Sequence, residues 1–104
     1  MKRFVSLALI ALSGCATSSV LQKKPVMTLT STVPVDRLEE CIALVMPGTV
    51  STIRGEGRRT ITAGGDGLTI AAVTITEGSP ATIELRQVTP VSGAIRAKIR
   101  ACAQ

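Results

Sequence analysis

Residues 49–88 read TVSTIRGEGRRTITAGGDGLTIAAVTITEGSPATIELRQV, and this stretch decides the fold. Short runs rich in Thr, Val and Ile alternate with turns that contain Gly, Asp, Ser or Pro. Such runs are typical of β-strands, and turns of a few residues between them are typical of hairpins. The stretch therefore predicts four strands in an antiparallel meander, at 49–54, 58–63, 68–76 and 81–88. In the third run the alternation shifts at Ala71-Ala72, which predicts a β-bulge there.

The residues before this stretch have the spacing of a helix. Apolar side chains recur every three or four positions from Val35 to Val45, which predicts a helix over 34–46. Ser31 or Thr32 is the expected cap, because a hydroxyl can accept a hydrogen bond from a free backbone N–H of the first turn.

The residues after it allow two interpretations. Ile95, Ile99 and Cys102 form a stripe at helical spacing, but apolar and basic residues also alternate from Ile95 to Ala101, as in a half-buried strand. The high content of Ala, Lys and Arg favours the helix. The expected fold is therefore α+β, with one helix, a four-stranded antiparallel meander and a C-terminal helix packed on the same face.

The first residues have the pattern of an export signal. Lys2 and Arg3 precede the apolar run 4–12, which as a helix would rise only about 14 Å, half of a bilayer's hydrocarbon core. A basic start, a short apolar run and small residues after it are typical of a signal peptide.

Leu12-Ser13-Gly14-Cys15 resembles the lipobox of bacterial lipoproteins, in which two small residues separate Leu from Cys. The resemblance implies cleavage between Gly14 and Cys15 and acylation of Cys15, and two or more acyl chains anchor a protein stably to a membrane. Ala16 stands where an inner-membrane lipoprotein often has Asp. The resemblance thus implies a lipid-anchored cell-envelope protein, at the outer membrane facing the periplasm rather than at the inner membrane. The alternative is an ordinary secretory signal followed by a chance cysteine.

The chain is accordingly expected to divide into three parts. Residues 1–14 are the lipoprotein signal peptide, residues 15–33 the lipidated N-terminus with a flexible tether, and residues 34–104 a small α+β domain. Small polar residues and Lys23-Lys24-Pro25 characterise the tether, whose extended reach is about 50 Å. Val20-Leu21 and Val26-Met27 leave room for a short strand within it.

Two cysteines remain once Cys15 is lipidated. An even count in an exported chain predicts a disulfide between Cys41 and Cys102, which would close a loop of about 62 residues and contribute about 4 kcal/mol. Two free buried thiols are the alternative. A redox pair would need the Cys-x-x-Cys spacing, and a zinc site would need more ligands than two cysteines without histidine.

Composition argues against most catalytic functions. The 104 residues include no His, Trp or Tyr and only one Phe, so the usual general base, the commonest metal ligand and the stacking surfaces for bases are missing. Gly64-Gly65-Asp66-Gly67 links two expected strands and does not precede a helix, so it predicts a hairpin turn and not a phosphate loop. We therefore expect no enzyme, no catalytic residues, no metal, no cofactor and no nucleic-acid partner.

The chain carries 12 basic and 7 acidic residues. Grouped cations can bind an anionic ligand, and the alternative is a solvated surface with some pairing to Glu39, Glu40 and Glu84. The first functional hypothesis is a non-catalytic envelope lipoprotein that binds a protein partner or supports envelope assembly. The second is a module that binds an anionic envelope ligand, and the third is a lipid-anchored inhibitor of an extracellular enzyme. The candidate anion-binding residues are Arg54, Arg58, Arg59, Arg96, Lys98 and Arg100.

Overall fold

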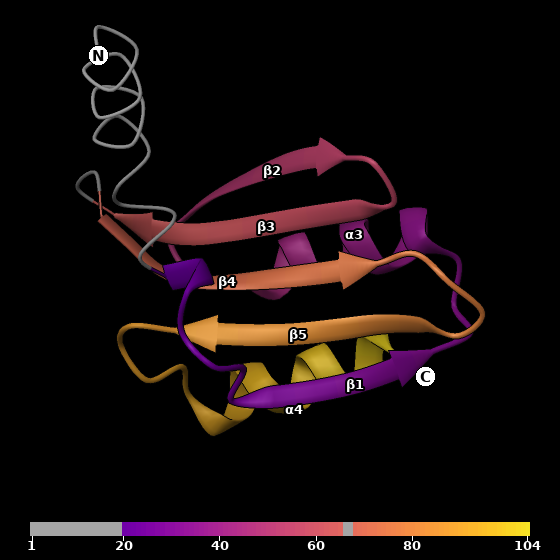
Figure 1. Cartoon of the computed structure of the whole chain (residues 1–104). Coiled ribbons are helices and arrows are strands. Elements are labelled where there is room, and N and C mark those ends of the chain that lie inside the picture. Colours follow the sequence, from indigo (N-terminus) through magenta and orange to yellow (C-terminus); the bar gives the residue numbers. More distant parts are fainter. Residues whose placement is uncertain (1–19, 66–67) are drawn as a thin grey trace, which may run out of the picture.

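The computed structural model describes residues 20–65 and 68–104. Figure 1 shows the helices and strands of this part of the chain in sequence colours. Their bounds are β1 Met27–Ser31, α3 Val35–Val45, β2 Thr49–Gly55, β3 Arg58–Gly65, β4 Leu68–Thr76, β5 Ala81–Gln87 and α4 Gly93–Cys102. The α+β class is confirmed, but the described sheet has five strands and not the four predicted from the sequence.

The sheet is antiparallel throughout, in the order β1-β5-β4-β3-β2. Strands β2 to β5 form the predicted meander, in which each strand pairs with the next, and their ends lie within two residues of the predicted ones. Strands β1 and β2 are consecutive in the chain but occupy opposite edges of the sheet. Helix α3 connects them across one face (Figure 1).

The fifth strand comes from the segment predicted to be a tether. All five residues of β1 pair with β5, from Met27 opposite Leu85 to Ser31 opposite Ala81. Met27 and Ser31 are buried, whereas the threonines between them are exposed, so the strand has one inward and one outward side. The prediction of a flexible tether over 15–33 is therefore wrong for this part, and the folded domain begins well before residue 34.

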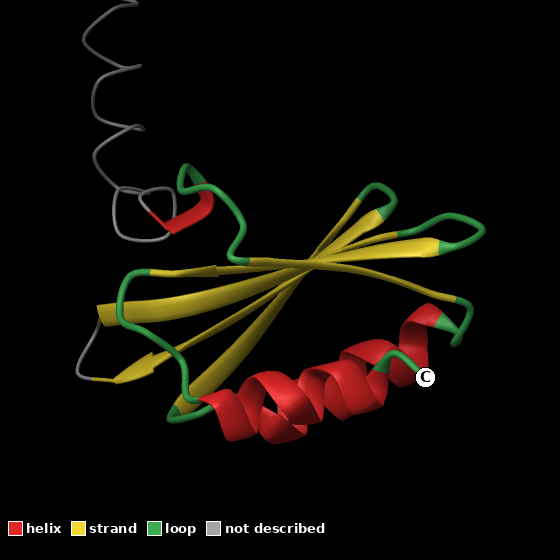
Figure 2. Cartoon of the chain, turned by 90° about the horizontal axis from the view of Figure 1, so that it is seen from below, coloured by secondary structure: helices red, strands yellow, loops and turns green. Residues whose placement is uncertain are grey.

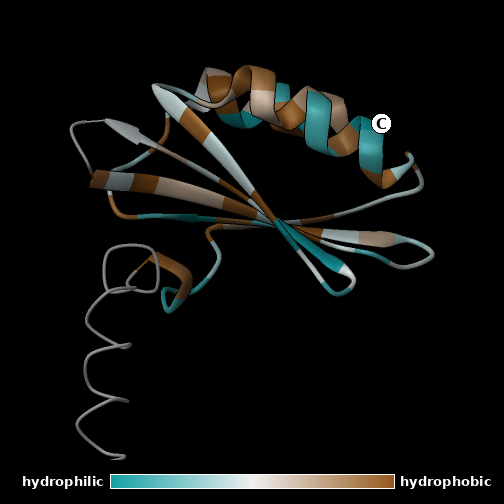
Figure 3. Ribbon diagram, turned by 90° about the horizontal axis from the view of Figure 1, so that it is seen from above, coloured by the Kyte–Doolittle hydropathy of each residue, from teal (hydrophilic) through white to brown (hydrophobic). Residues whose placement is uncertain are grey.

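Both helices cover the same face of the sheet, as Figure 2 shows from the side. Helix α3 contacts β2, β3 and β4 and also packs against α4. Brown and teal segments alternate along the helices in Figure 3, because each helix has an apolar side and a polar side. The largest side chains that are fully buried are aliphatic: Val20, Leu38, Ile42, Ile61, Val73, Ile75, Ile83, Leu85 and Ile99.

Helix α3 begins without the predicted hydroxyl cap. Pro34 occupies the N-cap position, and no side chain caps the helix. The hydroxyl of Ser31 instead accepts a hydrogen bond from the backbone N–H of Val33 (3.0 Å) and donates one to the carbonyl of Ala103 (2.6 Å). The prediction of a cap at Ser31 or Thr32 is wrong because Ser31 belongs to β1 and bonds to the far end of the chain.

The C-terminal segment is a helix, which decides between the two interpretations left open above. Ser92 caps α4, and its hydroxyl accepts a hydrogen bond from the N–H of Ile95 over 3.2 Å. Ile99 and Cys102, three positions apart, are both buried. The alternation of apolar and basic residues from Ile95 to Ala101 therefore does not indicate a strand here, because the segment packs as a helix.

The predicted bulge is present, one residue earlier than expected. Ala63 pairs with Ala71, but its neighbour Gly64 pairs with Thr69, so Ile70 has no partner in β3. The carbonyl of Ile70 accepts a hydrogen bond from the N–H of Val88 over 2.8 Å. The extra residue brings Ala71 and every second residue after it onto the side that faces the helices.

The face of the sheet away from the helices is called the open face below. The pairing of the strands places Ile53, Arg58, Glu84 and Arg86 on it, since successive side chains point to opposite sides. Residues 20–24, called the N-terminal turn, lie on this side of the sheet (Figure 2). Most of the open face is made of threonines: Thr28, Thr30, Thr60, Thr62, Thr74, Thr76 and Thr82.

Candidate functional site

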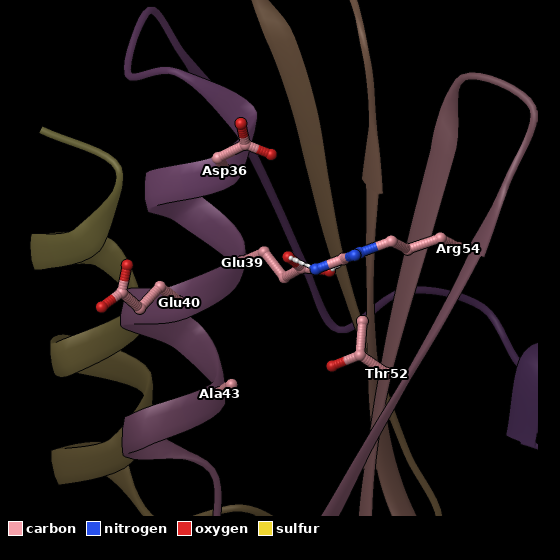
Figure 4. A pocket seen from close by; sticks show the side chains of 6 residues that line it. All are labelled: Asp36, Glu39, Glu40, Ala43, Thr52 and Arg54. Carbon is pink, nitrogen blue, oxygen red and sulfur yellow. Dashed lines mark hydrogen bonds and ion pairs between the residues drawn. The ribbon is translucent and has the colours of Figure 1, made fainter.

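A carboxylate on α3 holds an arginine of the edge strand β2. The Nε of Arg54 donates to Oε1 of Glu39 over 2.9 Å, and its second guanidinium nitrogen donates to Oε2 over 2.8 Å. The side chain of Glu39 is only 10% exposed, whereas that of Arg54 is 70% exposed. This two-bond geometry is the strongest form of an arginine–carboxylate pair, and it fixes the edge strand to the helix (Figure 4).

A second arginine completes the network from the neighbouring strand. Arg59 on β3 donates to a carboxylate oxygen of Asp36 and, over 3.4 Å, to Oε2 of Glu39. Its other terminal nitrogen lies 3.7 Å from a carboxylate oxygen of Glu77. The Arg59 side chain is 17% exposed, so most of its charge is balanced inside the protein.

The ion pairs shift the pKa values of all four groups. The hydrogen bond from Arg59, followed by its charge, lowers the pKa of Asp36. The hydrogen bond from Arg54 lowers the pKa of Glu39, although partial burial of the carboxylate opposes the shift. Both arginines have raised pKa values, mainly because they donate hydrogen bonds to these carboxylates. The cluster therefore stays fully ionised near neutral pH.

A groove of about 400 Å³ runs between α3 and β2 above this network. Asp36, Glu39 and Glu40 of α3 border it, but Asp36 is bound to Arg59 and Glu39 to Arg54. The side chain of Glu40 points away from Arg54 (Figure 4). No ion pair within 4.0 Å involves Glu40 among the described residues. The residues that line the groove are Asp36, Glu39, Glu40, Ala43, Thr52 and Arg54 (Figure 4).

The structure does not bring together the six cations proposed to bind an anion. Arg54 and Arg59 face the helices and are held by carboxylates, whereas Arg58 lies on the open face. Arg96, Lys98 and Arg100 lie on α4, which packs against α3. The expected pairing with Glu39 does occur, and Glu84 pairs with Arg86.

Cys41 and Cys102 form the predicted disulfide, which joins α3 to α4 with their Cα atoms 5.8 Å apart. The two helices that cover the sheet are therefore covalently linked at one point of their contact. Cys15 and the cleavage site at Gly14 lie outside the described residues, and so does the signal segment.

Two contributors to the site were missed in the sequence. Neither Asp36 on α3 nor Glu77 after β4 is marked by its sequence pattern as a partner of Arg59. A bulky charged residue at the first turn of a helix gives no indication of which strand will lie beside it. The pairing expected of Glu39 is present, but the residue is buried and does not belong to a solvated surface.

Over residues 20–65 and 68–104, no group of three or more Cys, Asp or Glu side chains is placed to hold a metal ion. No helix in that part of the chain is both long and apolar enough to cross a bilayer. Comparison with protein-family models, with curated proteins and with solved structures found no match.

Proposed function

We propose that this chain is a non-catalytic, lipid-anchored envelope protein that binds an extended segment of a partner protein along β2. The resemblance of residues 12–15 to a lipobox supports the anchor. The single observation that supports the binding function is the exposed edge of β2 beside the groove between α3 and β2.

Strand β2 has the properties of a strand that can accept a further strand. Six of its seven residues are exposed and only Val50 is half-buried, and within the described residues no strand pairs with its outer edge. Proteins usually protect such an edge with Pro, with Lys, with a bulge or by keeping it short. The sequence TVSTIRG contains neither Pro nor Lys, and its pairing with β3 has no register shift.

The groove indicates which partner would fit. A segment added to β2 would send alternate side chains over α3, where they would meet the groove. Asp36, Glu39 and Glu40 border the groove with three carboxylates. Asp36 and Glu39 are already bound to Arg59 and Arg54, whereas Glu40 has no ion pair within 4.0 Å among the described residues. The complementary partner is therefore an extended chain with Lys or Arg at alternate positions, held by backbone hydrogen bonds and selected by charge.

The binding function can be tested with a synthetic peptide of alternating lysine and valine. Added to the mature protein labelled with nitrogen-15, the peptide should shift the amide signals of β2 and of the first two turns of α3. Ile53→Lys places a cation at the edge strand and should abolish the shifts. Leu44→Lys, at an exposed position on α3, adds the same charge and should leave them intact. Amide shifts confined to α4, or none in β2, would reject the proposal.

The anchor has an independent test. In cells, Cys15→Ser should leave the protein without lipid, uncleaved by the lipoprotein peptidase, and absent from membranes washed with high salt. The wild-type protein should remain in the washed membranes and should begin at a lipid-modified residue 15 by mass analysis. The anchor would be rejected if the serine variant carried no lipid and were still recovered in the washed membranes at the wild-type level.

A further inference from the structure

The N-terminal turn, residues 20–24, is fixed to the open face of the sheet. Val20 is fully buried, and its carbonyl accepts a hydrogen bond from the N–H of Lys23 over 3.1 Å. The carbonyl of Lys23 accepts a hydrogen bond from Nε of Arg86, which lies on the open face, over 2.9 Å. Leu21 lines a hollow of about 290 Å³ together with open-face residues of β3, β4 and β5. The chain is therefore attached to this face from residue 20 onward (Figure 2).

This attachment limits how far the domain can move from a lipid on Cys15. Val20 lies five positions after Cys15, and a chain of five extended residues spans at most about 17 Å. The expected tether of about 50 Å is thus much too long, because its second half is folded. This step rests on the lipid anchor of the proposed function.

The same limit selects the face that can lie on the membrane. A five-stranded sheet is about 19 Å wide, and a helix layer adds about 10 Å to its thickness. To turn the helices toward the bilayer, the linker would have to pass around a sheet edge and then past the helix layer, a path of more than about 20 Å. To turn the open face toward the bilayer, it needs only to descend from the N-terminal turn.

The charges of the open face fit an anionic surface. Lys23, Lys24 and Arg58 are exposed, and none of them takes part in an ion pair within 4.0 Å among the described residues. Glu84 is already paired with Arg86. The surrounding threonine hydroxyls can donate hydrogen bonds to phosphate oxygens. Many side chains of this face are threonines, so it suits the headgroup layer better than the acyl chains.

We propose that the open face lies on the membrane surface, with Lys23, Lys24 and Arg58 against the phosphates of anionic lipids. The helices and the groove beside β2 then point away from the bilayer or along it. The lipid anchor holds the domain near the membrane, and the cations orient it.

A single introduced tryptophan can measure this orientation, because the protein contains none. Thr30→Trp places the probe at an exposed position of the open face, and Leu44→Trp places it on the exposed side of α3. The lipidated protein is incorporated into vesicles of phosphatidylethanolamine and phosphatidylglycerol that carry nitroxide-labelled headgroups. We expect strong quenching for Thr30→Trp and weak quenching for Leu44→Trp. Equal quenching, or stronger quenching at position 44, would overturn the inference.

The role of charge is tested by two matched triple variants in the Thr30→Trp background. Lys23, Lys24 and Arg58 are changed to Gln in one, and the exposed Arg37, Lys98 and Arg100 in the other. Each cation near an anionic surface should strengthen the contact about fivefold, so the first variant should lose most of the quenching at low salt. The second variant should keep the quenching. In vesicles of phosphatidylcholine alone, which lack anionic lipid, the quenching of the parent protein should fall. Equal loss in both variants would contradict the proposed contact.

Failure of this inference can be distinguished from failure of the anchor. A protein without lipid would not float with the vesicles in a density gradient, and the proposed function would then be wrong. A protein that floats but shows equal quenching at positions 30 and 44 would keep its anchor and lose only the orientation proposed here.

Discussion

The hydroxyl of Ser31 donates a hydrogen bond to the backbone carbonyl of Ala103 over 2.6 Å, although 72 positions separate the two residues in the chain. The same oxygen accepts a hydrogen bond from the N–H of Val33. Because Ser31 ends β1 and Ala103 follows α4, one buried side chain connects the first strand to the end of the last helix.

We expect Ser31→Ala to lower the free energy of unfolding by about 1–2 kcal/mol, because two backbone groups lose their partner in a buried position. Urea unfolding followed by circular dichroism measures the change. Thr32→Ala, at the exposed neighbouring position, should stay within about 0.5 kcal/mol of the wild type. An unchanged midpoint for Ser31→Ala would show that the bond has no net effect.

Glu39 should matter more for stability than the glutamate next to it. Glu39→Gln leaves the mostly buried Arg59 with one carboxylate fewer and disrupts the two hydrogen bonds from Arg54. We therefore expect the free energy of unfolding to fall by about 1–3 kcal/mol. Glu40→Gln removes an equal charge from an exposed position and should have little effect. Unfolding of both variants at the same urea concentration would contradict the larger contribution of Glu39 to stability.

The lowered pKa values of Asp36 and Glu39 predict how stability depends on pH. Their ordinary values are 3.8 and 4.5. Since each pKa is lower in the folded state, the unfolded chain binds more protons, and the free energy of unfolding falls as pH decreases below about 4.5. Above about pH 5.5 these two groups should contribute a constant amount. Urea titrations between pH 3 and 7 should show this fall, and Glu39→Gln should make it shallower while Glu40→Gln does not.

The sequence predicted the elements whose signals are local. Gly and Pro mark the ends of β2, β3, β4 and β5, and the shift of alternation indicated the bulge that forms at Ile70. Strand β1 was anticipated only as room for a short strand at Val26-Met27, because Met27–Ser31 is short and its partner lies fifty or more residues away. The alternation of Met27, Leu29 and Ser31 with threonines was the available signal.

From the sequence, only the kinds of residue in the ion-pair network could be predicted, and not which arginine pairs with which carboxylate. Pairing between arginines and Glu39 was one of the alternatives considered, but the choice of partners depends on where α3 crosses the sheet. That crossing follows from β1 occupying the edge opposite β2. Without the fifth strand, the position of Asp36 beside Arg59 could not be derived.

Two adjacent glycines should respond very differently to the same substitution. A Cβ on Gly64 would collide with the backbone carbonyl of Leu68, whereas a Cβ on Gly65 would meet nothing within 4 Å. Gly64→Ala should therefore destabilise the protein by about 2–4 kcal/mol, and Gly65→Ala should be neutral or slightly stabilising. Thermal unfolding of both variants tests this prediction, and equal melting temperatures would contradict it.

Removal of the disulfide should have a large effect. Replacing Cys41 and Cys102 with Ala frees a loop of about 60 residues in the unfolded chain, which corresponds to about 4 kcal/mol. Dithiothreitol should lower the urea midpoint of the wild type towards that of the double variant and leave the variant unchanged. Free thiols at both positions in the protein as isolated from cells would refute the bridge.

Strand β1, which is synthesised first among the described strands, can pair only with β5, which is synthesised last. Strand β1 has no neighbour until β5 exists, and Ser31 has no acceptor until Ala103 does. A growing chain therefore cannot complete this sheet before β5 and α4 have been synthesised. Folding would be completed only when nearly all of the chain has been synthesised, at the modest speed typical of sheets closed by distant segments.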